Sequence, residues 1–281
     1  MLAKVIQIVD QNESAPKELT NVISKDSAMA IRLLRIVNSP FYGRLHQIST
    51  INRAIIHLGT RATKAITLSI GVHPMFESDD TLIDRALFLR HSLETAIVCR
   101  EIAVLCSYEP PEEAFVLGLI HNIGLFILET NFRPEFKRIW DRVKAGEDLV
   151  AVEESELGTN HARVGKFLLN RWQIPGFMGE AIAQHHCKYS PGGQFLKSKL
   201  ARIVNLGNMV TKSRISRMRE VDKESIEEAN RLSESLGISP IALTQAQSKI
   251  LEMLVNESEL LNIEIGPVTN LLETANKLIY Q

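Results

Sequence analysis

Apolar residues recur along most of this chain at the three- and four-residue spacing of an amphipathic helix, and no stretch shows a convincing strand alternation. Residues 26–39 are an example, because the segment starts at Asp26, a candidate N-cap, carries one apolar face, and stops before Pro40. Residues 49–59 end at Gly59, which suits a left-handed cap, and another helical pattern follows at once. The pattern predicts an all-α, multi-helix fold with a tight corner at Gly59.

The rest of the chain is predicted to form further helices separated by short breaks. Pro111 suits the first turn of a strongly apolar helix, and Pro175 ends one helical pattern and opens another. These helices are expected at about residues 80–107, 111–129, 133–145, 148–157, 160–172, 176–187, 195–213, 222–236, 239–261 and 268–280.

The helices are predicted to form three regions, with a joint in the stretch "PMFESDD" near residues 74–80. We expect an N-terminal helical bundle over residues 1–78, a second helical core over residues 79–215, and a C-terminal helical extension over residues 216–281. The cleft between the bundle and the second core is the expected binding surface, because ligand sites favour such junctions.

Composition narrows the class of protein. Apolar residues make up 45% and charged residues 23% of the chain, which is ordinary for a globular protein. The formal net charge of −1 gives no general attraction to nucleic acid or to acidic membranes. The basic run "KSRISRMR" at residues 212–219 is typical of a solvated helix face. We therefore expect no nucleic-acid partner.

The cysteines and the apolar stretches bear on the compartment. Cys99, Cys106 and Cys187 form no CxxC pair and no even framework, which fits a reducing compartment. The first residues lack the apolar core and cleavage site of a signal peptide. The longest apolar stretch, residues 114–128, falls short of the roughly 20 residues that span a bilayer. We expect a cytoplasmic protein without a membrane partner.

Histidines supply the candidate chemistry. Five of the eight lie in the second core, and all five fall on predicted helices. A single buried histidine is usually a hydrogen-bonded core residue, whereas several on successive helices also fit a present or ancestral metal site, since imidazole is a common ligand. Both interpretations stay open from spacing alone. The five residues are His91, His121, His161, His185 and His186.

Several motifs together resemble one family, the HDOD domain, an HD-related output domain of bacterial signalling proteins. The resemblance extends from about residue 10 to residue 212. It is carried by "IRLLRIVNSPFYG" (31–43), "ISTINRAIIHLG" (48–59), "AFVLGLIHNIG" (114–124), "ELGTNHARVGKFLLNRWQIPGFMGEAIAQHH" (156–186) and "LARIVNLGNMV" (200–210).

The wider HD superfamily, which the HDOD domain resembles, implies a metal-dependent phosphohydrolase. The superfamily motif has a histidine, a His-Asp pair, further histidines and a last aspartate. The resemblance assigns His91 to the first histidine and His121 to the pair, with His161 and His185/His186 as the later ones. Asn122 then stands where the aspartate of the pair belongs, and Asn208 is the best match to the final aspartate.

These two asparagines change the expected chemistry. An aspartate carries a full negative charge and can bridge two cations, whereas an asparagine offers one neutral carbonyl oxygen. We therefore expect a degenerate metal site without catalytic residues or cofactor, holding at most a single residual metal ion on its histidines. Candidates for contact with a ligand or a residual metal are His91, His121, Asn122, His161, His185, His186 and Asn208.

The expected function is that of a non-catalytic regulatory module which binds other signalling proteins, with or without a bound small ligand such as a nucleotide second messenger. The alternative is a metal-dependent phosphohydrolase or phosphodiesterase acting on a nucleotide or cyclic dinucleotide, in which the two asparagines are tolerated. Phe41 and Tyr42 are candidate interface anchors, although "NSPFYG" also fits a purely structural turn.

Overall fold

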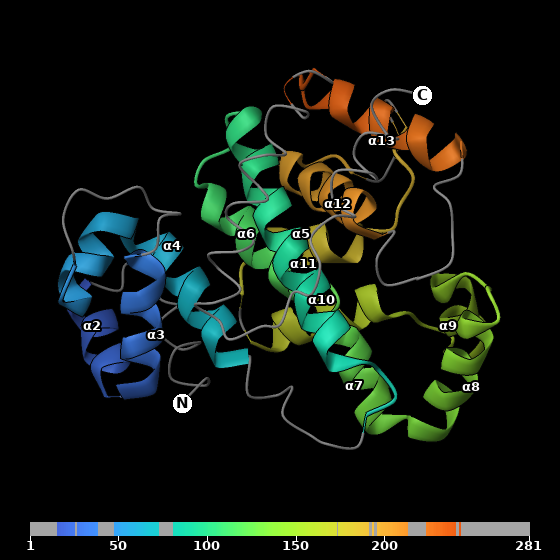
Figure 1. The fold of residues 1–281 in the computed structure, drawn as a ribbon, viewed down its shortest axis with the longest axis horizontal. Helices are drawn as coiled ribbons and strands as arrows, with labels where there is room; N and C mark the ends of the chain where they lie inside the picture. Colours follow the sequence, from blue (N-terminus) through green and yellow to red (C-terminus); the bar gives the residue numbers. More distant parts are fainter. Residues whose placement is uncertain are drawn as a thin grey trace.

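Every regular element in the described part of the chain is an α-helix (Figure 1). The computed structural model describes residues 16–25, 27–38, 48–72, 81–172, 174–190, 193, 196–212, 223–239 and 242. The prediction of an all-α fold is confirmed.

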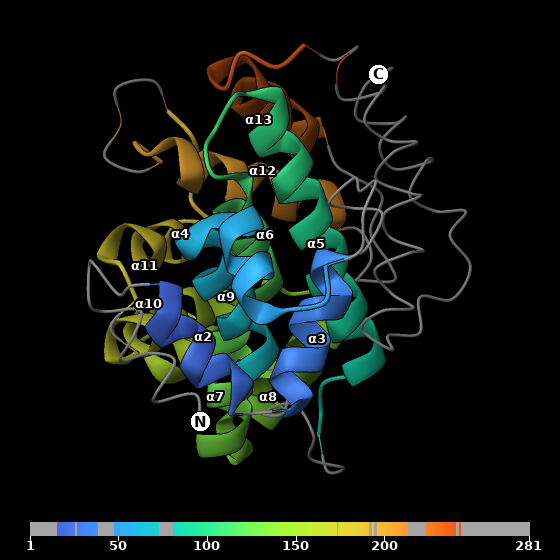
Figure 2. The same cartoon turned by 90° about the vertical axis from the view of Figure 1, so that its left-hand side faces the viewer.

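The N-terminal bundle contains three helices, α2 (Pro16–Ser24), α3 (Ser27–Val37) and α4 (Ile51–Val72), which face the viewer in Figure 2. They enclose an apolar core of their own, in which Leu33 and Ile55 are almost fully buried. Helix α4 is kinked at Gly59, which has φ 78° and ψ 161°. The predicted corner is therefore present, at a backbone conformation that disfavours side chains with a Cβ.

Asn38 joins the two ends of the segment between α3 and α4. Its amide Nδ2 donates to the carbonyl oxygens of Leu34 and Ile48, at 2.8 and 2.7 Å, and its Oδ1 accepts from the Ile48 amide at 2.7 Å. Asn38 therefore ties the end of α3 to the residues that precede α4. Phe41 and Tyr42 themselves lie outside the described residues.

The second core is built on helices α5 (Arg85–Leu105) and α6 (Pro111–Ile120), which pack backbone against backbone. Gly118 permits this approach, because a Cβ there would lie 2.6 Å from the Cα of Ala96. Helix α12 (Lys199–Lys212) packs on α5 as well.

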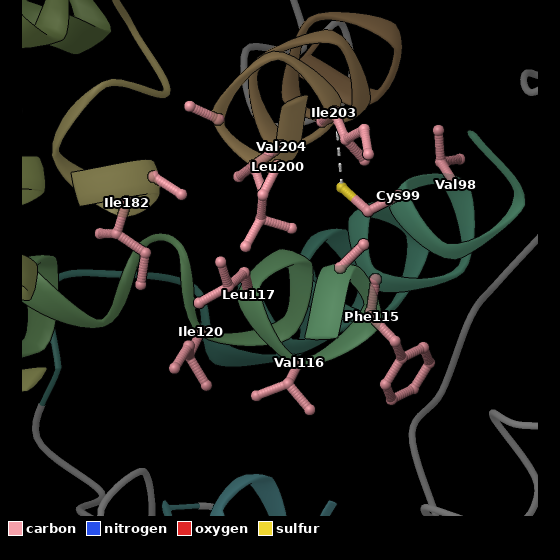
Figure 3. Close-up of a cluster of buried hydrophobic side chains, with 14 of the residues drawn as sticks. Val98, Cys99, Phe115, Val116, Leu117, Ile120, Ile182, Leu200, Ile203 and Val204 are labelled. Carbon is pink, nitrogen blue, oxygen red and sulfur yellow. Dashed lines mark hydrogen bonds between the residues drawn. The ribbon is translucent and has the colours of Figure 1, made fainter. Parts of the chain in front are cut away.

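The contact between α5 and α12 depends on a second small residue. A Cβ at Gly207 would lie 2.3 Å from the Sγ of Cys99. Figure 3 shows Cys99 among the apolar side chains between the two helices, where its thiol donates to the carbonyl oxygen of Ile203 at 3.8 Å. Burial raises the pKa of this thiol well above its usual range. Cys99 is therefore a packing residue.

Six further helices complete the described fold. Helix α10 packs on α7 and α11, α8 packs on α9, and α13 packs on α12 (Figure 1). Residues of α13 join the hydrophobic cluster of the second core. The six are α7 (Ile123–Asn131), α8 (Arg133–Lys144), α9 (Leu149–Leu157), α10 (His161–Arg171), α11 (Gly176–Ala183) and α13 (Lys223–Ser235).

The prediction of one continuous helix over residues 111–129 is wrong. The helix breaks at His121 and Asn122, where Asn122 has φ −98° and ψ 12° and precedes the first turn of α7. The whole stretch Pro111–Asn131 is long and apolar enough to cross a membrane by composition, but 83% of its most apolar window is buried inside the protein. The stretch forms the centre of the second core.

The predicted helices at residues 239–261 and 268–280, the joint at residues 74–80, and the proposed N-cap Asp26 fall outside the described residues, wholly or in large part. The division at residues 78 and 215 therefore stays a prediction. Within the described residues, the buried apolar side chains form two separate clusters, one between Leu19 and Ile66 and one between Ile83 and Ile238.

Candidate functional site

The five histidines of the second core meet in its interior and form one continuous cluster, hereafter the histidine cluster. Ring centroids are 5.1 Å apart for His91 and His121, and 5.1 Å for His121 and His185. They are 5.3 Å apart for His161 and His185, 4.9 Å for His161 and His186, and 4.0 Å for His185 and His186.

The histidines come from four places in the fold. His91 lies on α5 and His161 is the first residue of α10, whereas His121 lies in the turn between α6 and α7. His185 and His186 lie in the turn after α11, which ends at Ala183 instead of the predicted residue 187. The expectation that all five lie on helices is therefore wrong for three of them, because the chain turns where it reaches the cluster.

Burial of the cluster is nearly complete. His121, His161 and His185 have no exposed surface, His91 is 1% exposed, and His186 is partly exposed. Burial lowers the pKa of His121 to about 4 and that of His185 well below its usual value, because a charged imidazole loses its hydration there. These two rings are neutral at physiological pH.

Fixed acceptors determine which nitrogen of each ring carries the proton. Nδ1 of His121 lies 2.7 Å from the carbonyl oxygen of Gly118, and Nδ1 of His185 lies 2.6 Å from that of Ile182. A carbonyl oxygen can only accept, so both Nδ1 atoms donate. In the neutral rings, the Nε2 lone pairs therefore point into the cluster.

Nδ1 of His161 also faces a fixed acceptor, which is the carboxylate of Glu153. The Oε2 atom of Glu153 accepts from Nδ1 of His161 at 2.7 Å and from its backbone amide at 3.1 Å. Glu153 is completely buried, and its Oε1 has no hydrogen-bond partner in the described part of the chain. A carboxylate behind a ligating histidine is the usual arrangement in zinc sites.

Sequence reasoning missed Glu153. It lies in "VEESELGTNH", where three glutamates in a short helix read as a solvated face. The available signal was its place beside Val152, which is 1% exposed, on the inner face of α9.

Local contacts hold α9 so that Glu153 reaches the cluster. Arg138 and Arg142 of α8 both bind Glu156, with nitrogen–oxygen distances of 3.0 Å. The chain then turns through Gly158, with φ 67°, into Asn160, whose Oδ1 caps α10 by accepting from the Arg163 amide at 3.0 Å. The short turn places Glu153 directly behind His161.

Contact between α7 and α10 is equally close. A Cβ at Gly124 would lie 2.0 Å from the carbonyl oxygen of His161. Only glycine allows this approach of the two backbones. The position of the His161 ring is therefore fixed from both sides, by Glu153 and by the backbone of α7.

The other end of the cluster is closed by neutral polar groups. Nε2 of His91 lies 3.2 Å from Nε2 of His121, and the side chain of Asn208 hydrogen-bonds to the His121 ring. Thr95 Oγ1 lies 3.5 Å from Nε2 of His91 and 2.8 Å from Oγ1 of Thr211 on α12. The structure thus brings Asn208, the residue that the resemblance matches to the final aspartate, next to His121.

Asn122 follows His121 in the turn and is 5% exposed. Its side chain does not cap α7, and its Oδ1 has no hydrogen-bond partner among the described residues. A buried acceptor left without a donor typically costs about 1–3 kcal/mol. Asn122 therefore presents a neutral, unpaired oxygen where the HD motif has a carboxylate.

Two cations bridged by carboxylates do not fit these residues. Asn122 and Asn208 supply no negative charge, and the Asn208 side chain is engaged with His121. A single ion that favours nitrogen ligands does fit. Three ligand nitrogens, one from each of His161, His185 and His186, lie within 4.8 Å of one another. Cys187, the next residue, is partly exposed, and burial raises the pKa of its thiol.

A hollow lies between the N-terminal bundle and the second core, at the place where the sequence predicted a binding surface. It is open to solvent and separate from the histidine cluster. The corner of α4 forms one wall and the loop between α5 and α6 forms the other. Its lining residues are Leu58, Gly59, Thr60, Ala62, Glu109 and Pro110.

Comparison with known proteins decides the family. The profile of the HDOD domain matches residues 1–188, more than half of the chain. The chain belongs to the HDOD family. An HDOD-domain protein of unknown function from Geobacter sulfurreducens has the same fold, with a TM-score of 0.74 at 21% identity over 92% of this chain and 91% of that one. The resemblance predicted from the sequence is confirmed.

Two further comparisons give similar proteins from other bacteria. A protein of Shewanella amazonensis with the provisional name of a phosphohydrolase aligns with a TM-score of 0.68 at 20% identity, over 99% of this chain and 92% of that one. An uncharacterized protein of Treponema pallidum (strain Nichols) is 23% identical over 190 residues, which is 66% of this chain. The matched region is 36% of that relative's length, so the relative extends well beyond it.

Proposed function

We propose that this HDOD protein is a non-catalytic, cytoplasmic signalling module that acts through contacts with other signalling proteins. One observation carries the proposal: the two positions that would hold bridging aspartates are buried amides, Asn122 and Asn208, and Asn208 is hydrogen-bonded to His121. Hydrolysis of a phosphoester by two metal ions needs those charges to hold the ions and to activate water.

Electrostatics supports the same conclusion. Removing two carboxylates leaves two units less negative charge to balance two divalent cations, in an interior where charges interact more strongly than in water. Glu153 keeps one negative charge near the cluster, but its Oε2 is occupied by His161. The remaining donors suit at most one metal ion.

The hollow between α4 and the α5–α6 loop is the surface that we assign to partner proteins. It joins the N-terminal bundle to the second core, so a partner seated there contacts both. Surfaces at such junctions are common binding sites. A nucleotide second messenger is a candidate for a small ligand of the module.

The alternative function is a metal-dependent phosphohydrolase, and the convergence of five imidazoles favours it. Purified protein loaded with Mn²⁺, Fe²⁺ or Zn²⁺ and offered cyclic dinucleotides and nucleotides separates the two functions. We expect no turnover above the level of a His121→Ala variant treated in the same way. Turnover in the wild type that is absent in His121→Ala would contradict the non-catalytic function and support the hydrolase.

Calorimetry tests the nucleotide as a small ligand. Titration with cyclic dinucleotides and guanosine polyphosphates gives heat if the protein binds them. Absence of heat across that panel would remove these ligands and leave the protein-contact role in place.

A further inference from the structure

Three imidazoles at one end of the cluster form a compact set of ligands, hereafter the histidine triad: His161, His185 and His186. Their ligand nitrogens lie within 4.8 Å of one another. Two of the rings are completely buried, and His186 reaches the surface. The set is thus preformed and still accessible from solvent.

Proton positions in the triad leave two lone pairs facing each other. Nδ1 of His161 donates to Glu153 and Nδ1 of His185 donates to the Ile182 carbonyl, so a ring that carries one proton presents its Nε2 as an acceptor. These two Nε2 atoms lie 3.4 Å apart. Two acceptors cannot hydrogen-bond to each other, and 3.4 Å exceeds the usual hydrogen-bond length of about 2.7–3.2 Å. A cation between them satisfies both.

The spacing of the nitrogens fits a tetrahedral ion. Zinc–nitrogen bonds of about 2.0–2.1 Å in a tetrahedral site put neighbouring ligand nitrogens about 3.3–3.4 Å apart. Nε2 of His161 lies 3.4 Å from Nε2 of His185 and 3.0 Å from Nε2 of His186. The third pair of ligand nitrogens, from His185 and His186, lies within 4.8 Å, so a shift of the partly exposed His186 ring would complete that geometry.

Glu153 completes the arrangement from behind. Its carboxylate accepts from Nδ1 of His161, which fixes the ring and makes its Nε2 a better electron donor. Its buried negative charge also offsets part of the charge of a divalent ion. Glu153 is a positioning residue, since it acts through His161.

We propose that the histidine triad binds one transition-metal ion of the Zn²⁺ class, positioned by Glu153, and that this ion is the small ligand of the signalling module. The proposal rests on the non-catalytic function only in naming that ligand. Three imidazole ligands disfavour Mg²⁺ and Ca²⁺, which prefer oxygen ligands, and leave one coordination position for water or a partner's side chain.

Equilibrium dialysis of the full chain against Zn²⁺, followed by elemental analysis, tests the proposal. We expect about one Zn²⁺ per chain in the wild type, a loss to background in His186→Gln, and full retention in His57→Gln. His186 is partly exposed, so its substitution leaves the core packing intact, while the exposed His57 on α4 controls for binding by surface histidines. Circular dichroism verifies the fold of each variant.

Two further measurements do not depend on His186→Gln. Co²⁺ in the wild type should give the intense visible absorption of a tetrahedral site, and dialysis against Mg²⁺ should leave no bound ion. Glu153→Gln should keep the stoichiometry at saturating Zn²⁺ but weaken the affinity about 10–100-fold, as outer-sphere partners do. A Glu153→Gln variant with unchanged affinity would remove the positioning role.

Absence of tightly bound Zn²⁺ in the wild type would overturn the metal proposal, as would equal Zn²⁺ content in the wild type and His186→Gln. Either result leaves the protein-contact function standing. Conversely, hydrolysis by the Zn²⁺-loaded wild type would overturn the proposed function while keeping the metal site, so the two failures are distinguishable.

Discussion

The two ends of the histidine cluster satisfy their ring nitrogens in different ways. At the His91–His121 end, the rings contact each other and the neutral side chains of Asn208 and Thr95. At the triad end, His161 and His185 direct Nε2 atoms at each other, and a buried carboxylate lies behind His161. The first end is linked mainly by contacts among neutral groups, with Oδ1 of Asn122 left unpaired among the described residues, and the second end keeps the character of a ligand set.

This difference follows from where negative charge remains. Asn122 and Asn208, which the resemblance matches to the aspartates of the HD motif, lie at the His91–His121 end. Glu153 supports only the triad end. We therefore expect no metal pair at the His91–His121 end, whereas the triad end keeps nitrogen ligands for a single ion.

The largest effect is expected from disrupting the close backbone contact between α7 and α10. Gly124→Ala places a Cβ 2.0 Å from the His161 carbonyl oxygen, a clash with backbone that only separation of α7 and α10 relieves. We expect a loss of about 3 kcal/mol or more in the free energy of unfolding. Chemical denaturation measures it.

Gly176→Ala is the matched control for this variant. A Cβ at Gly176 meets nothing within 4 Å, so its stability should change by less than about 1 kcal/mol. Equal stability of the two variants would show that the α7–α10 contact does not fix His161.

A buried charge at the His91–His121 end should have the next largest effect. Asn122 is 5% exposed, and Asn122→Asp puts a carboxylate there. Desolvation raises the folded-state pKa of such a group, so the penalty is small below about pH 4, the unfolded value, and grows as the pH rises. We expect a destabilisation of about 2 kcal/mol at pH 7 in chelator-treated protein.

Denaturation at pH 4 and pH 7 measures this difference directly. Asn52→Asp, an exposed substitution in the first turn of α4, controls for added charge near the start of a helix. A penalty that shrinks as the pH rises would contradict a solvent-excluded turn.

Acidification probes both ends together. The folded-state pKa of His121 is about 4, whereas a free histidine titrates near 6.5. Between these two pKa values, His121 is therefore protonated in the unfolded chain but not in the folded one. The contribution of neutral His121 to the free energy of unfolding is full above about pH 6.5 and is lost as the pH falls towards 4.

Between pH 7 and pH 5, we expect chelator-treated protein to lose about 1–2 kcal/mol for His121 alone. Denaturant titrations at several pH values measure the slope. Because His57 is exposed, His57→Gln should leave the slope unchanged. A flat profile would mean that the cluster is hydrated.

The smallest effect is expected on Zn²⁺ affinity when a histidine outside the triad is substituted. His91 contacts His121 and lies outside the histidine triad. His91→Gln should therefore change the Zn²⁺ affinity by less than about threefold, measured by competition with a chelating dye. An affinity loss like that of His186→Gln would show that the ends form one site.

The pattern of apolar residues predicted most of the helices, because each buries one face against a neighbour. Gly59 was predictable as a corner, since its left-handed conformation is one that glycine adopts easily. The break at His121–Asn122 was not predictable, because no proline or glycine marks it and the apolar pattern continues across it. The break lies between two close backbone contacts, at Gly118 and Gly124, which depend on the tertiary fold.

The resemblance to the HDOD domain identified the histidines, but their division into two ends depends on proton positions that spacing does not encode. Glu153 escaped notice because its acidic neighbours at residues 154 and 156 resemble a solvated face. Its role depends on the turn through Gly158, which brings α9 back to His161. Such a contact between consecutive helices follows only from the three-dimensional path of the chain.

The contact at Gly118 has a mechanical consequence. With no side chain between α5 and α6, the two helices touch through their backbones and cannot slide or tilt independently. His91 and His121 are thus attached to one stiff frame. Gly124 joins α7 to α10 in the same way, so His161 is held against that frame as well. His185 and His186 lie outside both backbone contacts, in the turn after α11, and a change in the shape of the cluster is expected to come from them.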